Sequence, residues 1–251
     1  MHILLTNDDG IAAPGIKALW EELSNFAKIT VVAPDSEKSA TSQAITVHHP
    51  IRVDEYFMEN PDIRAWRVGG TPTDCVKLAL EALLLGYPDL VISGINQGPN
   101  LGTDVLYSGT VSAAIEGAMH GLPAIAVSLD SWHPYDFTPT ARIIANLIKK
   151  MVLGSLPRYT LLNVNVPAKP ADELAGITIT KLGVRQYENT FERRQDPRGR
   201  VYYWMGGKIM ATDNDPDSDV MTVSRGEVSV TPIHFDLTNY ELMHLLTEWK
   251  L

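Results

Sequence analysis

Short apolar runs alternate with helical patterns along much of the chain. The runs are typical of strands buried on both faces of a sheet, and they cover residues 3–6, 29–33, 89–93, 123–128 and 161–166. Between the runs, apolar residues recur at three- and four-residue spacing, as Ile16, Leu19 and Leu23 do after Pro14. Alternation of this kind predicts an α/β fold, with a mostly parallel sheet flanked by helices.

Helix start signals refine this prediction. The clearest lies at residues 71–74, where Thr71 can cap the helix, Pro72 suits its first position and Asp74 can return a hydrogen bond. Helices are expected over residues 14–23, 72–86, 110–120, 138–151 and 239–249. Two more polar runs, at residues 47–56 and 65–68, predict strands nearer an edge of the sheet.

The pattern changes after Ile177. Residues 187–193 and 200–204 flank a turn at residues 196–199, which predicts a β-hairpin, and a further strand is expected at residues 227–231. We therefore expect a core over residues 1–176 and, over residues 177–251, a hairpin arm followed by a terminal strand and helix. Aromatic side chains of this arm, such as Phe191 and Trp204, need a surface to pack against.

Composition narrows the function classes. The chain has 251 residues and a formal net charge of −9, so it lacks the cationic surplus of a general binder of nucleic-acid duplexes. A single cysteine, Cys75, excludes an intramolecular disulfide framework and cysteine-cluster metal sites. The first residues lack the basic segment of a signal peptide, and no run approaches the roughly 20 apolar residues of a membrane span. A cytoplasmic location is the expectation.

Candidate chemistry begins directly after the first strand, at Asp8 and Asp9. Ligands bind at the carboxyl ends of parallel strands, near the point where the strand order reverses. Two adjacent carboxylates repel each other unless a cation or hydrogen-bond donors offset them, and such oxygen ligands suit Mg²⁺ or Mn²⁺. The alternative is that both residues only form a turn and cap the next helix.

Loops after two other strands add to this pair. The loop after the second strand carries Ser39 and other hydroxyls, and a glycine-rich loop after the run at 89–93 carries Asn96 and Asn100. The second loop ends at Ser108, where a helix start offers amide and hydroxyl groups to a phosphate. Conformational turns and simple helix capping are the alternatives. Together the loops favour metal-assisted hydrolysis of a phosphate ester.

These motifs resemble those of the SurE family of stationary-phase survival proteins. The matching segments span nearly the whole chain and are ILLTNDDGI at 3–11, VAPDSEKSA at 32–40, GTPTDCV at 70–76, SGINQGPNLG at 93–102, SGTVSAA at 108–114, NVNVP at 163–167 and TPI at 231–233. The resemblance implies a metal-dependent phosphatase that acts on nucleoside 5′-monophosphates. Members are also described as hydrolysing 3′-nucleotides and short polyphosphate.

The family pattern also implies residue roles and an assembly. It implies one divalent ion per subunit, Mg²⁺ or Mn²⁺, and the metal ligands would be Asp8, Asp9, Ser39 and Asn96. The phosphate and substrate contacts would be Asn7, Asn100, Ser108, Gly109 and Thr110. The implied fold is a Rossmann-like core with a C-terminal arm exchanged between subunits, which gives a homodimer or homotetramer.

Several alternatives stay open from sequence. In the preferred mechanism, Asp8 or Asp9 orients a water or accepts its proton, whereas the competing mechanism makes Asp8 a nucleophile that forms an aspartyl phosphate. The rival function is a nucleotide sensor that binds phosphate without turnover. The acidic run at residues 213–219 lacks the glycine and glutamate of a calcium loop, so we expect it to be a solvated loop.

Overall fold

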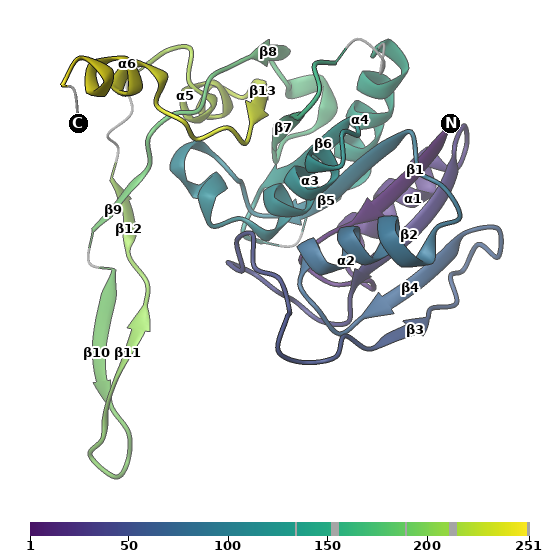
Figure 1. The fold of residues 1–251 in the computed structure, drawn as a ribbon, viewed down its shortest axis with the longest axis horizontal. Coiled ribbons are helices and arrows are strands. Elements are labelled where there is room, and N and C mark those ends of the chain that lie inside the picture. Colours follow the sequence, from purple (N-terminus) through teal and green to yellow (C-terminus); the bar gives the residue numbers. More distant parts are fainter. Residues whose placement is uncertain (134, 152–155, 189, 211–214, 250–251) are drawn as a thin grey trace.

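The computed structural model describes residues 1–133, 135–151, 156–188, 190–210 and 215–249 (Figure 1). A nine-stranded sheet runs through the centre of this described part. In spatial order its strands are β3 (Val53–Glu55), β4 (Arg64–Val68), β2 (Lys28–Pro34), β1 (His2–Thr6), β5 (Leu90–Gln97), β6 (Ala124–Asp130), β7 (Thr160–Pro167), β13 (Val228–His234) and β8 (Ile177–Ile179).

The strand order confirms the prediction of a mostly parallel sheet. The six strands β4, β2, β1, β5, β6 and β7 are parallel to one another, whereas β3 pairs antiparallel with β4 and β13 pairs antiparallel with β7. From β1 the chain moves outward through β2 and β4 on one side, and later through β5, β6 and β7 on the other. The strand order therefore reverses between β1 and β5, where a ligand crevice is expected at the carboxyl ends.

Helices cover both faces of the sheet. The covering helices are α1 (Pro14–Leu23), α2 (Pro72–Leu78), α3 (Gly109–Met119) and α4 (Thr138–Lys150). The short helix α5 (Asp219–Ser224) contacts β13 and β7, whereas α6 (Tyr240–Glu248) has no buried residue and lies apart from the sheet (Figure 1). Because side chains of a strand alternate between faces, Ile3 and Leu5 of β1 pack in the layer of α1 and α4, and Leu4 packs in the layer of α2 and α3. The site is thus held on a core that is closed on both sides.

The capping box predicted at Thr71 is present. The Thr71 side chain accepts the Asp74 amide, and the Asp74 carboxylate accepts the Thr71 amide. Two lengths are corrected: α2 ends at Leu78 and continues as a π-helical turn (Ala79–Leu83), and the strand expected over 47–56 is only β3. The Asp74 carboxylate also accepts the amide and hydroxyl of Thr46, which joins the chain before β3 to the start of α2.

The arm projects away from the body of the molecule (Figure 1). Strands β10 (Phe191–Gln195) and β11 (Val201–Met205) pair antiparallel around the predicted turn, and β9 (Gln186–Glu188) pairs with β12 (Lys208–Met210). Trp204 of β11 is 59% exposed. β8 and β13 belong to the main sheet, so the chain returns to the core after the arm. Within the described residues, no helix is long and apolar enough to cross a membrane.

Candidate active site

Four elements meet at the reversal of strand order. β1 ends at Thr6 and leads into Asp8 and Asp9, the loop after β2 covers residues 35–52, β5 ends at Gln97, and α3 begins at Gly109. Hydrogen bonds tie these elements to the carboxylate pair. Asp8 accepts the amide of Lys38 on its backbone carbonyl at 2.7 Å, and Asp9 Oδ2 accepts the amide of Gln97 at 3.2 Å. The three strand-end loops therefore meet as predicted.

Asp8 is buried against the start of α3. Its side chain is 4% exposed, and its Oδ1 accepts the hydroxyl of Thr110 at 2.5 Å. A Cβ on Gly109 would lie 3.0 Å from the Asp8 Oδ2, so glycine leaves the room that the carboxylate occupies. Burial raises the pKa of Asp8, and the Thr110 hydrogen bond opposes that rise. The positive end of the helix also favours an anion here.

Asp9 is partly buried and lies beside this charge. Burial, followed by repulsion from Asp8, raises the pKa of Asp9 to about 7. Two carboxylates with raised pKa values at a strand end are typical of a site that a cation completes. Asp8 is buried and Asp9 is half-buried, whereas the residues of a simple turn are usually exposed, so the burial supports the predicted ligand role, which stays a prediction.

The raised pKa of Asp9 predicts a pH-dependent stability. In the unfolded chain its carboxyl has a pKa near 3.8, and in the folded chain its pKa is about 7. Below about pH 4 both states are protonated, whereas above about pH 7 the folded state holds a charge that it disfavours, so this group's contribution to stability falls as pH rises. We expect the melting temperature of Asp9→Asn, relative to that of the unsubstituted protein, to be higher at pH 8 than at pH 5 in EDTA. Saturating Mn²⁺ should reduce this advantage at pH 8, and an equal difference at both pH values would contradict the assignment.

The other two expected metal ligands lie on the adjoining loops. Ser39 is exposed after β2, and its hydroxyl donates to Glu37 Oε1 at 2.7 Å. Asn96 lies at the end of β5, and its amide nitrogen donates to the Gly98 carbonyl at 2.7 Å, which leaves its carboxamide oxygen for an ion. The set offers two carboxylates and two neutral oxygens. Such oxygen donors fit a hard divalent ion that retains several waters. Among the described residues, no group of three or more His, Cys, Asp or Glu side chains that could hold a metal is found.

The start of α3 has the features of a phosphate site. Ser108 is its N-cap, and the Ser108 hydroxyl accepts the amide of Val111 at 3.0 Å. Gly109 lies against Asp8, and Thr110 is fully buried. The helix start therefore lies next to the carboxylate pair, where its amide groups can bind an anion.

Asn7 and Asn100 are held in the interior. Asn7 is fully buried and donates to the Gly10 carbonyl at 2.9 Å. Asn100 is 8% exposed and donates from its side chain to the Ser128 hydroxyl at 2.8 Å. Both side chains therefore shape the loops that carry the site, and direct contact with a substrate stays a prediction.

Two asparagines of β7 were not anticipated as supports of the site. The side-chain amides of Asn163 and Asn165 donate to the Asn100 carbonyl at 2.8 and 3.0 Å, and Asn165 Oδ1 accepts the Asn100 amide at 2.8 Å. Both side chains are fully buried. The available signal was their spacing, because asparagines two residues apart in an apolar run lie on one face of a buried strand.

Asp219 corrects the expectation of a solvated acidic loop. It is fully buried, and its carboxylate accepts the amides of Gly102 and Gly183 at 2.8 Å each. Residues 211–214 of that run lie outside the described part, but Asp219 joins the loop before α3 to the base of the arm. A second link lies nearby, where Arg185 Nη1 is 3.0 Å from Asp104 Oδ2. Partners this distant in sequence leave no local signal.

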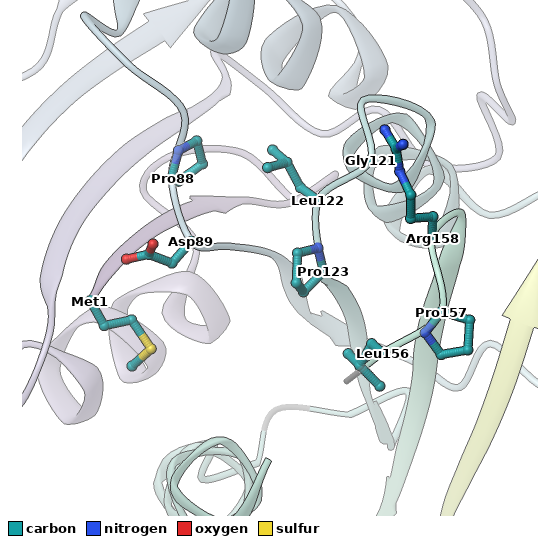
Figure 2. A pocket seen from close by; sticks show the side chains of 9 residues that line it. All are labelled: Met1, Pro88, Asp89, Gly121, Leu122, Pro123, Leu156, Pro157 and Arg158. Carbon is teal, nitrogen blue, oxygen red and sulfur yellow. The ribbon is translucent and has the colours of Figure 1, made fainter. Parts of the chain in front are cut away.

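A pocket of about 370 Å³ opens beside the carboxylates. Asp9, Gln97 and Phe137 are among the residues that line it. Figure 2 shows a larger pocket of about 540 Å³, lined by Met1, Asp89, Pro123 and Arg158 among others. These residues lie at the amino ends of β1, β5, β6 and β7, the edge of the sheet opposite to the site.

Comparison with known proteins agrees with this geometry. The family model described as Survival protein SurE matches residues 3–189. The chain belongs to the SurE family. A relative from Heliobacterium modesticaldum named 5′-nucleotidase SurE is 56% identical over 249 residues, which cover 99% of this chain and 92% of the relative. Another of that name, from Carboxydothermus hydrogenoformans, is 54% identical over 253 residues, covering 99% and 96%.

A solved SurE structure shares the fold. The crystal structure of the SurE protein from Aquifex aeolicus matches with a TM-score of 0.86 and 39% identity, and the match covers 100% of both chains. The family resemblance stated from the sequence motifs is thus confirmed, and so is the Rossmann-like fold with C-terminal hairpins. The SurE motifs quoted above include the strand-end loops that carry Asp8, Asn96 and Ser108.

Proposed function

We propose that this SurE protein is a 5′-nucleotidase, a phosphomonoesterase that hydrolyses nucleoside monophosphates to nucleoside and phosphate. Relatives with more than half of their residues identical over nearly the full chain carry that name. The observation that carries the proposal is the contact of the buried Asp8 carboxylate with Thr110 at the start of α3. This contact supports an arrangement in which metal-type ligands lie beside a bound phosphate, whereas a sensor would need only the phosphate site.

The residues that would hold a divalent ion, Mg²⁺ or Mn²⁺, are Asp8, Asp9, Ser39 and Asn96. Such an ion supplies Lewis-acid polarisation of the phosphate and a bound water of lowered pKa. Ser108, Gly109 and Thr110 bind the phosphoryl oxygens through amides and hydroxyls, which stabilises charge that develops during hydrolysis. One of the two carboxylates orients the attacking water and accepts its proton.

The arm and the cell location complete the proposal. We infer a homo-oligomer, a dimer or a tetramer, in which a second copy covers the exposed aromatic side chains of β10 and β11, such as Phe191 and Tyr203. A two-stranded ribbon is marginal by itself, so packing against another copy would stabilise it. A cytoplasmic location belongs to the same proposal.

Phosphate release tests the activity directly. We expect the protein to release phosphate from AMP and GMP with Mn²⁺ or Mg²⁺, and to lose this activity in excess EDTA because the ligand oxygens alone provide no Lewis acid. Activity should return when the ion is restored. Turnover that persists in EDTA would contradict metal dependence, and tight AMP binding without turnover would favour the sensor.

A further inference from the structure

Trp132 lies at the same edge of the sheet as the site. It follows β6, which ends at Asp130, and β6 is the direct neighbour of β5. In their register Gln97 of β5 is opposite Leu129 of β6, and the Gly98 amide donates to the Leu129 carbonyl at 3.0 Å. The turn that carries Trp132 is therefore joined to the end of β5 that carries Asn96.

The indole of Trp132 is seated on Gly98. A Cβ built on Gly98 would lie 2.8 Å from Cζ3, 3.0 Å from Cη2 and 3.1 Å from Cε3 of the ring, so a side chain at this position would displace the indole. The Asn96 side chain donates to the carbonyl of this same glycine at 2.7 Å. One residue thus supports both the indole and a predicted metal ligand, which fixes the ring close to the reaction centre.

The turn also presents the ring to solvent. The Ser131 hydroxyl donates to the His133 carbonyl at 2.9 Å and accepts the His133 amide at 3.3 Å, which closes the turn around Trp132. Even with its contact to Gly98, Trp132 is 68% exposed. A ring that is held at one side and open at the other is suited to stacking, because every nucleobase offers a π-face.

We propose that Trp132 is the platform on which the nucleobase of the substrate stacks, so that it sets the preference for nucleotides over phosphate esters without a base. This inference rests on the proposed nucleotidase function. The phosphate binds at the start of α3, the ion is held by Asp8, Asp9 and Asn96, and the base extends past Gly98 onto the indole. Trp132 then contributes to substrate binding and leaves the chemical step unchanged.

Tyr107 is the competing aromatic residue. It directly precedes Ser108 and is also 68% exposed. Its backbone carbonyl accepts the Ser42 amide at 3.1 Å, and Tyr107 lines a pocket with residues at the base of the arm, such as Arg185 and Tyr187. Trp132 is the better platform because its ring lies on Gly98, whose carbonyl binds the predicted ligand Asn96, and because an indole offers a larger face for stacking than a phenol.

The test compares AMP with ribose 5-phosphate, which has the same scissile ester and no base. Trp132→Ala is expected to raise KM for AMP about tenfold with little change in kcat, and to leave both constants for ribose 5-phosphate unchanged. Trp132→Phe should restore most of the AMP affinity. Phe57→Ala is the matched control, because Phe57 is an aromatic residue that follows β3 and is 92% exposed. This variant should leave kcat and KM unchanged for both AMP and ribose 5-phosphate.

Equal effects of Trp132→Ala on both esters, or no effect on AMP, would overturn the proposal, as would a base-selective loss in Tyr107→Ala alone.

Adenosine provides a readout that does not depend on turnover. Adenosine should quench tryptophan emission of the unsubstituted protein, and Trp132→Phe should abolish that change although four tryptophans of the original five remain. Quenching that persists in this variant would contradict the platform. Absence of phosphate release from every ester would instead contradict the nucleotidase function.

Discussion

Asp8→Asn is expected to lower kcat/KM for AMP by about a hundredfold or more. Asparagine keeps an oxygen that can accept the Thr110 hydroxyl, but it carries no charge to hold a divalent ion at the start of α3. The measurement is steady-state phosphate release at saturating Mn²⁺, combined with ion binding by calorimetry. Ion affinity should fall together with activity.

The stability of the same variant separates chemistry from folding. Because burial raises the pKa of Asp8, the ionised carboxylate is a cost to the ion-free fold, and the neutral asparagine removes that cost. We expect Asp8→Asn to melt in EDTA at the same temperature as the unsubstituted protein or above it. Asp54→Asn, at an exposed carboxylate of β3, is the matched control and should leave activity intact. Full activity in Asp8→Asn would contradict the assigned site.

Gly15→Ala is expected to give the largest loss of stability. Gly15 lies in the first turn of α1, where an added Cβ would be 2.0 Å from the carbonyl oxygen of Ile95 in β5. Contact with backbone cannot be relieved by a rotamer change, so helix and strand must separate. We expect a loss of about 3 kcal/mol or more, measured by urea unfolding.

Gly86→Ala is the matched control for this substitution. No atom lies within 4 Å of a Cβ built on Gly86. The expected change is within about 0.5 kcal/mol. Similar unfolding midpoints for the two variants would show that α1 does not approach β5 as closely as described.

The elements that the sequence predicted well are those with local signals. The strand at residues 3–6 and the helix after Pro14 follow from hydrophobic spacing, and the start of α2 follows from its capping residues. The hairpin follows from its turn, in which Asp196 Oδ1 accepts the amides of Arg198 and Arg200. In each case the residues that determine the structure are neighbours in the chain.

Predictions were wrong where contacts with segments distant in sequence determine the local structure. Residues 94–97 were taken as loop because of glycine, yet β5 continues through them. A Cβ on Gly94 would lie 2.3 Å from the Val127 carbonyl, so this glycine permits close approach of β6 rather than a turn. Asp219 was placed in a solvated loop for the same reason, since its partners Gly102 and Gly183 are remote in sequence.

The candidate site shows both cases. The cluster of Asp8, Asp9 and the start of α3 follows from the general rule for parallel sheets, because strand order brings their loops together. The burial of Asn7 and Asn100 does not follow from that rule. It depends on side-chain hydrogen bonds to Gly10 and Ser128 that only the folded chain defines.

The asparagines of β7 also bear on how the sheet selects its alignment. Asn163 and Asn165 are opposite Ala126 and Ser128 of β6, and both donate to Asn100. A shift of the β7 register by one residue would turn both side-chain amides toward the opposite, apolar layer. The backbone amide and carbonyl of Asn100 would then lose their hydrogen-bond partners. Runs of valine and leucine alone would tolerate several alignments. Because these hydrogen bonds form only in the native register, any other register has a higher free energy. The same asparagines that hold Asn100 therefore also disfavour incorrect pairing of β7 with β6.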